Sequence, residues 1–227
     1  MIGRAAWILC ALLCLLLPFG NLEGASRDED RVLAVAQNME AAFKRVEDYS
    51  CDVDLTCYQE GIEKQRYRFK FYYKKEKKIR VDFFHPQPGL TIFYKDGDKK
   101  ATVVPFRSLP ALKFRLSVDN PAMKTLAGQR INQTDMGYFI NFLLINLKKV
   151  KQKESAFYED EERVEFLLWA LDYIKERSPE KYRISISKKY WLPLRIERYS
   201  SEDKLLEVSN IKDYVLNAQI EDKFFLP

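Results

Sequence analysis

The strongest constraint on the fold is an alternation of apolar and charged side chains with a period of two. It runs from residue 49 to 106 and returns between 163 and 215. From Arg66 to Lys74, aromatic residues occupy every second position and basic residues most of the others. Successive side chains of a strand point to opposite faces, so each such run predicts a strand with one apolar face. Asp96-Gly97-Asp98, between two such runs, predicts a hairpin turn and antiparallel pairing.

Eight or more strands of this kind predict a single antiparallel sheet with one solvated face, curled by its own twist. Helical spacing of apolar residues predicts two long helices, over Asp28–Asp48 and 135–149. The second is apolar over more than half its circumference, so we expect it to cover something apolar. Pro105–Asn132 has no sustained period and predicts a long excursion with short helices. The fold class is therefore α+β, mainly antiparallel β, with the helices on the concave side of a curved sheet.

The first residues resemble an export signal. Arg4 precedes an uncharged run, Ala5–Phe19, and Gly24-Ala25-Ser26 offers small residues for cleavage. The run of about 15 residues is shorter than the roughly 20 that a spanning helix needs, which favours a cleaved signal over an uncleaved anchor. Cys10 and Cys14 lie inside the run, which argues against a lipoprotein signal. We expect a signal peptide over 1–25, a single domain over 26–227 and a periplasmic or extracellular location.

Export permits disulfides, and Cys51 and Cys57 are the cysteines beyond the signal. They are six residues apart in a predicted strand. At about 3.3 Å per residue they would lie roughly 20 Å apart, whereas a disulfide needs Cα atoms within about 7 Å. A bridge would require a turn between them. Two buried free thiols on one strand face are expected instead.

The charge pattern and the single histidine restrict the possible functions. The formal net charge is +5, with basic and acidic residues interleaved, which fits a modest attraction to anionic membranes and does not indicate nucleic-acid binding. His85 is the only histidine, so no histidine triad or histidine-rich metal site can form. The cysteine spacing is not that of a redox pair, and no glycine-rich phosphate loop occurs.

Two polar motifs have structural interpretations. The acidic run Glu159–Glu162 is better explained as a hairpin turn than as a calcium site, and Thr134 or Asp135 is expected to cap the second helix. We therefore expect no enzyme, no catalytic residue, no metal and no cofactor. Paired carboxylates stay open as an alternative, since spacing does not reveal which carboxylates meet in space.

Three segments near the C-terminus carry a family resemblance. They are the strand with Leu192-Pro193-Leu194-Arg195, the run Ile211–Asn217, and the tail Ile220-Glu221-Asp222-Lys223-Phe224. Together they resemble the end of LolA-like proteins, the periplasmic carriers of outer-membrane lipoproteins and their relatives. The resemblance implies an incomplete, eleven-stranded β-barrel with helices as a lid, holding acyl chains inside.

These observations lead to a functional hypothesis of a periplasmic carrier or chaperone that binds acyl chains of lipids or lipoproteins. An envelope membrane protein is an expected partner, and the chain is expected to be a monomer. One alternative is that the inner aromatics are ordinary core without a cavity. Others are a non-enzymatic envelope sensor or interaction module on the same scaffold, and, as a third candidate, an enzyme. The predicted lipid-binding side chains are Tyr67, Phe69, Phe71, Tyr73, Ile79, Val81, Phe83, Phe139, Phe142 and Leu143.

Overall fold

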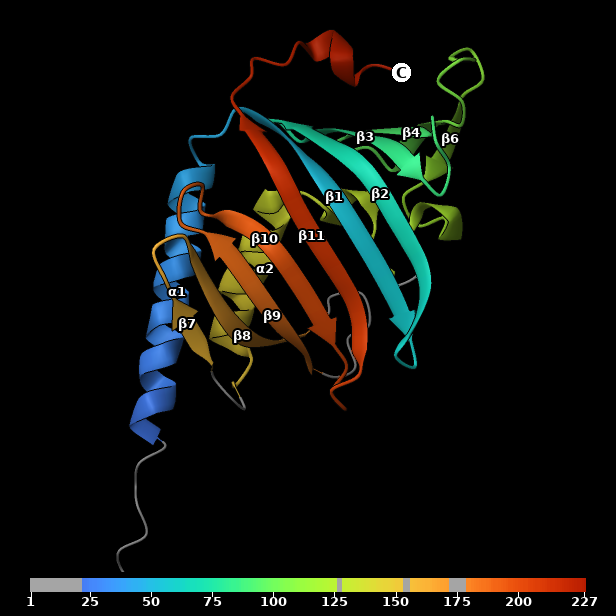
Figure 1. Ribbon diagram of the computed structural model, residues 1–227. Helices are drawn as coiled ribbons and strands as arrows, with labels where there is room; N and C mark the ends of the chain where they lie inside the picture. The colour runs from blue at the N-terminus through green and yellow to red at the C-terminus, as the bar shows by residue number, and fades with distance from the viewer. Residues whose placement is uncertain (1–21, 126–127, 153–155, 172–178) are drawn as a thin grey trace, which may run out of the picture.

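A computed structural model describes residues 22–125, 128–152, 156–171 and 179–227, with the side chains of the first helix from Asp28 onward. Figure 1 shows one curved sheet with helices against it. The two long helices are α1 (Leu22–Phe43) and α2 (Met136–Lys149), and three 3₁₀ turns are η1 (Pro121–Met123), η2 (Ile131–Gln133) and η3 (Asp222–Phe225). The strands are β1 (Asp48–Gln59), β2 (Ile62–Lys74), β3 (Lys78–His85), β4 (Thr91–Lys95), β5 (Lys100–Val104), β6 (Phe114–Ser117), β7 (Phe157–Glu159), β8 (Arg163–Leu171), β9 (Pro179–Ser187), β10 (Leu192–Tyr199) and β11 (Leu205–Leu216).

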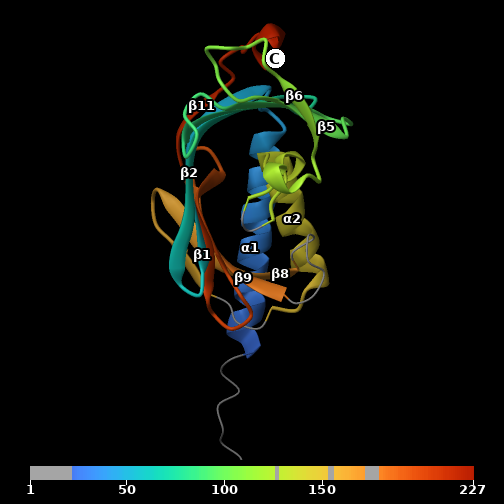
Figure 2. The same ribbon diagram turned by 90° about the vertical axis from the view of Figure 1, so that its right-hand side faces the viewer.

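The eleven strands form one antiparallel sheet in the order β6-β5-β4-β3-β2-β1-β11-β10-β9-β8-β7. Two meanders of neighbouring strands are joined where β1 pairs with β11, with Tyr49 opposite Leu216 and Cys57 opposite Glu207. The sheet is open, because β6 and β7 lie at its two ends. Turned by 90°, it curves around α1 and α2, which lie on its concave side (Figure 2). The predicted curved antiparallel sheet with helices on the concave face is confirmed.

Most turns lie where the residue pattern predicts them. The β1–β2 hairpin turns at Glu60 and Gly61, whose φ angles of 55° and 76° are both positive. Positive φ at both central residues gives the twist that matches paired strands, and glycine adopts it without steric cost. The acidic run 159–162 joins β7 to β8, as expected of a hairpin turn. Two short edge strands, β6 and β7, have too few residues to show a period, and β6 lies inside the predicted excursion 105–132.

The second helix follows its prediction more closely than the first. The Asp135 carboxylate accepts a hydrogen bond from the Tyr138 backbone N–H at 3.0 Å and caps α2. Helix α1 begins at Leu22 and ends at Phe43, so the predicted end at Asp48 was wrong. Asp48 instead opens β1, where its carboxylate accepts hydrogen bonds from the backbone N–H groups of Ala218 and Ile220.

The predicted signal peptide, 1–25, lies largely outside the described residues. Within the described part of the chain, no helix has both the length and the apolar character needed to cross a bilayer.

The C-terminal tail packs on the outer face of the sheet, over β2 and β3. Asp222 forms ion pairs with Lys74 at 2.7 Å and Lys78 at 3.0 Å. The ring of Phe224 lies edge-on to Tyr72, with centroids 4.8 Å apart, and the Arg80 guanidinium stacks over it. Figure 1 shows the tail above the ends of these strands. The tail therefore covers part of the solvated face.

The two helices pack mainly against one half of the concave face. Buried residues of α1 and α2 form one core cluster with β8 and β9, which includes Met39, Leu143 and Phe166. The cluster under β1 to β5 receives only Met136 from the start of α2 and the partly buried Phe43 from the end of α1, and the rest of its cover comes from the segment around Met123 and Ile131. Half of the concave face is thus covered by irregular chain rather than by a packed helix.

Candidate binding cavity

The larger of two hollows lies on this less covered half of the sheet. It has a volume of about 700 Å³ and is partly open. Strands β2, β3 and β4 form its floor, and residues 121–125 and 128–134 form its cover. The strand residues of its wall are mostly aromatic or aliphatic. They are Tyr67, Phe69, Phe71, Val81, Phe83 and Ile92, with Leu55 from β1 and Gln65 from the start of β2.

A smaller hollow of about 150 Å³ adjoins it beneath α2. Leu55, Phe69, Phe71, Gln129 and Thr134 line both hollows, so the two share a wall. The other lining residues come from the centre of the sheet and from the first turns of the helix. They are Cys51, Val53, Gln133, Met136, Tyr138, Phe139, Phe142, Tyr182, Ile196, Arg198, Glu207, Ser209 and Ile211.

The structure places most of the sequence-predicted lining residues at these walls. Tyr67, Phe69, Phe71, Val81 and Phe83 line the larger hollow, and Phe69, Phe71, Phe139 and Phe142 line the smaller one.

The three remaining predicted residues lie in packed core. Tyr73 stacks on Tyr49 with ring centroids 5.1 Å apart, and Ile79 and Leu143 are fully buried. Alternation identified the inner face correctly for the two strand residues, Tyr73 and Ile79, and helical spacing did so for Leu143. Alternation did not distinguish the positions under the helices from those facing open space.

Sequence reasoning missed a polar end of the smaller hollow. The Arg198 Nε and Glu180 Oε2 atoms lie 3.5 Å apart, with both side chains nearly buried. Glu207 is directly opposite Arg198 on the neighbouring strand and is also buried. Opposite charges offset each other's desolvation, which makes such a cluster tolerable inside a protein. A β-bulge between Pro193 and Arg195 shifts the phase of β10.

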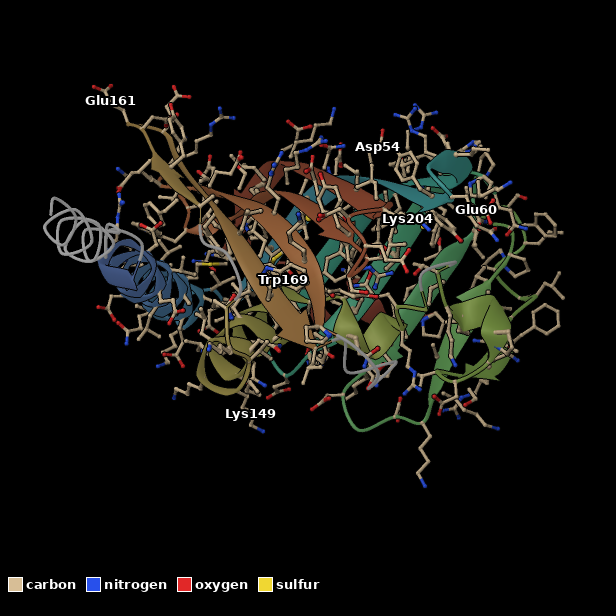
Figure 3. The ribbon with its side chains drawn as sticks, turned by 90° about the horizontal axis from the view of Figure 1, so that it is seen from below. Asp54, Glu60, Lys149, Glu161, Trp169 and Lys204 are labelled. Atoms are coloured by element: carbon tan, nitrogen blue, oxygen red, sulfur yellow. The ribbon has the colours of Figure 1, made fainter. Side chains whose placement is uncertain are left out.

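The outer face is charged, in contrast to the hollow side. Arg66 Nε donates to Asp54 Oδ1 at 2.8 Å across the β1–β2 pair, and this interaction lowers the pKa of the Asp54 carboxyl. In the view from below, Asp54 points away from the interior, and Glu60 and Lys204 lie at neighbouring hairpin turns (Figure 3). The sheet thus has one face for water and one for apolar contacts, as the residue pattern predicts.

The wall of the larger hollow is mainly apolar. Among the described residues no cluster of three or more potential metal ligands is present. Cys51 and Cys57 are buried and free, as predicted, and burial raises the pKa of the Cys51 thiol. His85 ends β3 on an exposed position next to the loop that begins at Pro86. The arrangement can enclose an apolar guest and place a polar group of that guest near Arg198.

The chain matches no protein-family model, and no curated protein matches it. Solved structures with a similar fold include a LolA superfamily protein from Nitrosomonas europaea, at 14% identity and a TM-score of 0.39, covering 85% of this chain and 97% of that one. Lipoprotein LppX of Mycobacterium tuberculosis is 10% identical, with a TM-score of 0.48 and coverage of 85% and 98%.

A chain of the Pseudomonas aeruginosa MucA/MucB complex is 9% identical, with a TM-score of 0.49, covering 87% of this chain and 61% of that one. LolA-like proteins are thus among the similar structures, in agreement with the resemblance in the sequence. The likeness concerns the fold alone.

Proposed function

We propose that the protein binds acyl chains of lipids or lipoproteins in the larger hollow, as a non-enzymatic carrier or chaperone of the bacterial periplasm. The observation that carries the proposal is a partly open hollow of about 700 Å³ with an aromatic floor. Its size is typical of small-molecule sites, which range over about 300–1,000 Å³. The alternative of ordinary packed core applies to the cluster formed by α1, β8 and β9, which includes Met39 and Phe166.

Apolar burial supplies the affinity. Each CH₂ group moved from water into such a site contributes about 0.8 kcal/mol, before the cost of ordering the chain. The rings of Phe69 and Phe83, with centroids 5.3 Å apart, offer broad contact surfaces to a flexible chain. Contacts of this kind are non-directional, so the site would accept chains of different length and select weakly among them.

The adjoining smaller hollow would take the polar end of the guest. Gln129 and Thr134 line both hollows and stand at their junction, and Arg198 and Glu207 lie beyond them. An ester or carboxyl group would exchange its water for hydrogen bonds donated by Gln129, Thr134 or Arg198. The chain would then lie along β2 and β3, with its polar group toward β10.

The proposal is tested by native mass spectrometry of the purified protein, with extraction and identification of any bound lipid, and by titration with a fluorescent fatty acid. Leu55→Trp adds an indole at the wall shared by both hollows and is expected to lower probe affinity at least tenfold. Lys212→Trp adds the same group on the exposed outer face and should leave affinity unchanged. Near-ultraviolet circular dichroism establishes that both variants are folded. Protein that is empty after purification and does not bind the probe would refute the proposal.

A second variant tests the same site even if Leu55→Trp does not fold. Phe83→Ala enlarges the larger hollow without adding bulk, so the preferred chain length of the bound probe should increase. An unchanged preference in a folded variant would place the guest elsewhere.

A further inference from the structure

The loop between β5 and β6 exposes large apolar side chains. Phe106 is 53% exposed, Leu109 58% and Leu112 41%, and Phe114 at the start of β6 is 49% exposed. Contiguous exposed apolar side chains on a soluble domain are typical of interaction sites.

The loop has a defined conformation. The Leu109 N–H donates to the Phe106 carbonyl at 2.9 Å, and the Leu112 N–H donates to the Leu109 carbonyl at 3.0 Å. These bonds close two consecutive turns with an apolar residue at each junction. At the root of the loop, Arg107 pairs with buried Asp82 at 2.8 Å. The apolar side chains are therefore presented by an ordered loop that is tied to the sheet.

The charge around the loop has one sign. Residues 101–118 contain Arg107, Lys113 and Arg115 and no acidic residue. Lys113 and Arg115 are exposed, and the described part of the chain provides no ion pair for either. Exposed apolar residues flanked by cations are the combination that binds the interface of an anionic bilayer, with the apolar groups among the acyl chains and the cations at the headgroups.

The loop also neighbours a second loop that lines the larger hollow. Strands β3 and β5 run in the same direction, since each is antiparallel to β4 between them. The loops that follow them, 86–90 and 105–113, therefore leave the same end of the sheet. Pro86, Gln87 and Leu90 line the larger hollow, and a Cβ at Gly89 would lie 3.6 Å from the Arg107 nitrogen. Figures 1 and 2 both show the 105–113 loop projecting beyond the sheet on the side of the molecule where the C-terminal tail lies.

We propose that the loop 105–115 docks the protein on anionic lipid bilayers, with Phe106, Leu109 and Leu112 inserted at the interface and Lys113 and Arg115 at the headgroups. This goes beyond the proposed function, because docking requires no guest in the hollow. Docking would, however, bring the neighbouring loop 86–90, which lines the larger hollow, close to the membrane surface.

The test is co-sedimentation of the purified protein with sucrose-loaded vesicles of phosphatidylglycerol and phosphatidylcholine, compared with vesicles of phosphatidylcholine alone. We expect binding to the anionic vesicles that falls at least tenfold between 50 and 500 mM salt, because salt screens the cationic contribution. Phe106→Ser combined with Leu109→Ser and Leu112→Ser should reduce partitioning at least tenfold. Lys113→Glu with Arg115→Glu should abolish the preference for the anionic lipid.

The matched control is Ile62→Ser. Ile62 is 61% exposed, but it lies in the β1–β2 hairpin between Glu60 and Glu63. Its substitution should leave vesicle binding unchanged. Because all these side chains are exposed, the unfolding midpoint should change little in any variant.

Three results would overturn the proposal: no binding of the unsubstituted protein to anionic vesicles, loop variants that bind as well as it does, or an Ile62→Ser variant that loses binding equally. Sedimentation velocity tests whether the loop instead binds a second copy of the chain. A concentration-dependent dimer that the triple serine variant abolishes, without vesicle binding, would assign the loop to a second copy of the chain. Fatty-acid titration of the same variants separates docking from the proposed function, because Phe106, Leu109 and Leu112 line neither hollow.

Discussion

The backbone N–H of Met136 donates a hydrogen bond to the hydroxyl oxygen of Tyr49 over 3.2 Å. Tyr49 is fully buried in β1, and burial raises the pKa of its hydroxyl far above the ordinary value, so the group stays neutral. The bond ties the centre of the sheet to the first turn of α2. One of the N–H groups that a helix start leaves without an internal partner is satisfied in this way.

Tyr49→Phe should therefore destabilise the protein. It leaves the Met136 N–H buried without its acceptor, which costs about 1–3 kcal/mol. Urea unfolding monitored by circular dichroism measures the change. Tyr73→Phe is the matched control, because it removes a hydroxyl from the same aromatic cluster but no hydrogen bond found among the described residues. Equal losses in both variants would show that the Tyr49 hydroxyl bond has no special role.

Gly137→Ala should also destabilise, although alanine favours helix formation. A Cβ at residue 137 would lie 2.9 Å from the Phe43 Cε1 atom, and the Phe43 ring is itself packed against Tyr49 and Tyr73. Overpacking of this kind costs about 1–3 kcal/mol, against a propensity gain of at most about 1 kcal/mol.

In a Phe43→Leu background the clash is removed, and Gly137→Ala should become neutral or stabilising. A double-mutant cycle of unfolding free energies measures the difference. If the two substitutions are simply additive, α1 and α2 do not meet at this point as described.

The contact between the C-terminal tail and the sheet should weaken at low pH. Hydrogen bonds from Lys74 and Lys78 lower the pKa of Asp222 from 3.8 to about 2. A lowered pKa in the folded state gives a contribution that is complete above pH 3.8 and is lost as pH falls through about 2. The difference in unfolding free energy between the unsubstituted protein and Asp222→Asn should be constant above pH 5 and shrink between about pH 4 and 2. A difference that does not change with pH would show that the ion pairs with Lys74 and Lys78 are not made in solution.

The two buried thiols should be unreactive in the folded protein. Burial raises the pKa of Cys51, and the reactive species is the thiolate. In a background with Cys10 and Cys14 replaced by serine, a thiol-reactive dye should label Cys51 and Cys57 slowly in buffer and rapidly in denaturant. The single variants Cys51→Ser and Cys57→Ser show which thiol accounts for each phase of the labelling time course. Rapid labelling of Cys51 in buffer would mean that the smaller hollow admits the dye.

Periodicity was sufficient to predict the sheet, because the inward positions from Tyr67 to Tyr73 in β2 and from Ile79 to Phe83 in β3 carry aromatic or branched apolar side chains. The capping residue Asp135 correctly indicated the start of α2. Periodicity placed the end of α1 at Asp48, since an acidic residue after a helical run gives no sign that it will instead accept hydrogen bonds from Ala218 and Ile220, far away in the chain.

The candidate site was only partly predictable. Tyr67 and Tyr73 have the same signature in the sequence, yet one faces a hollow and the other is stacked between aromatic rings. The difference depends on where the helices lie over the sheet, which is a tertiary property. Arg198 follows the alternation and faces the same side as Ile196, but a basic side chain gives no apolar signal, so it was not identified as a lining residue.

Strands β6 and β7 stand at opposite ends of the sheet and are not hydrogen-bonded to each other. In a closed barrel the strand number and stagger determine the diameter, so widening it means breaking a ladder. Here no hydrogen-bonded ladder closes the sheet into a barrel. The width of the interior is therefore set by side-chain packing and by the bend of the strands. A bulkier guest can therefore be admitted by flattening the sheet slightly, with every backbone pair between neighbouring strands retained.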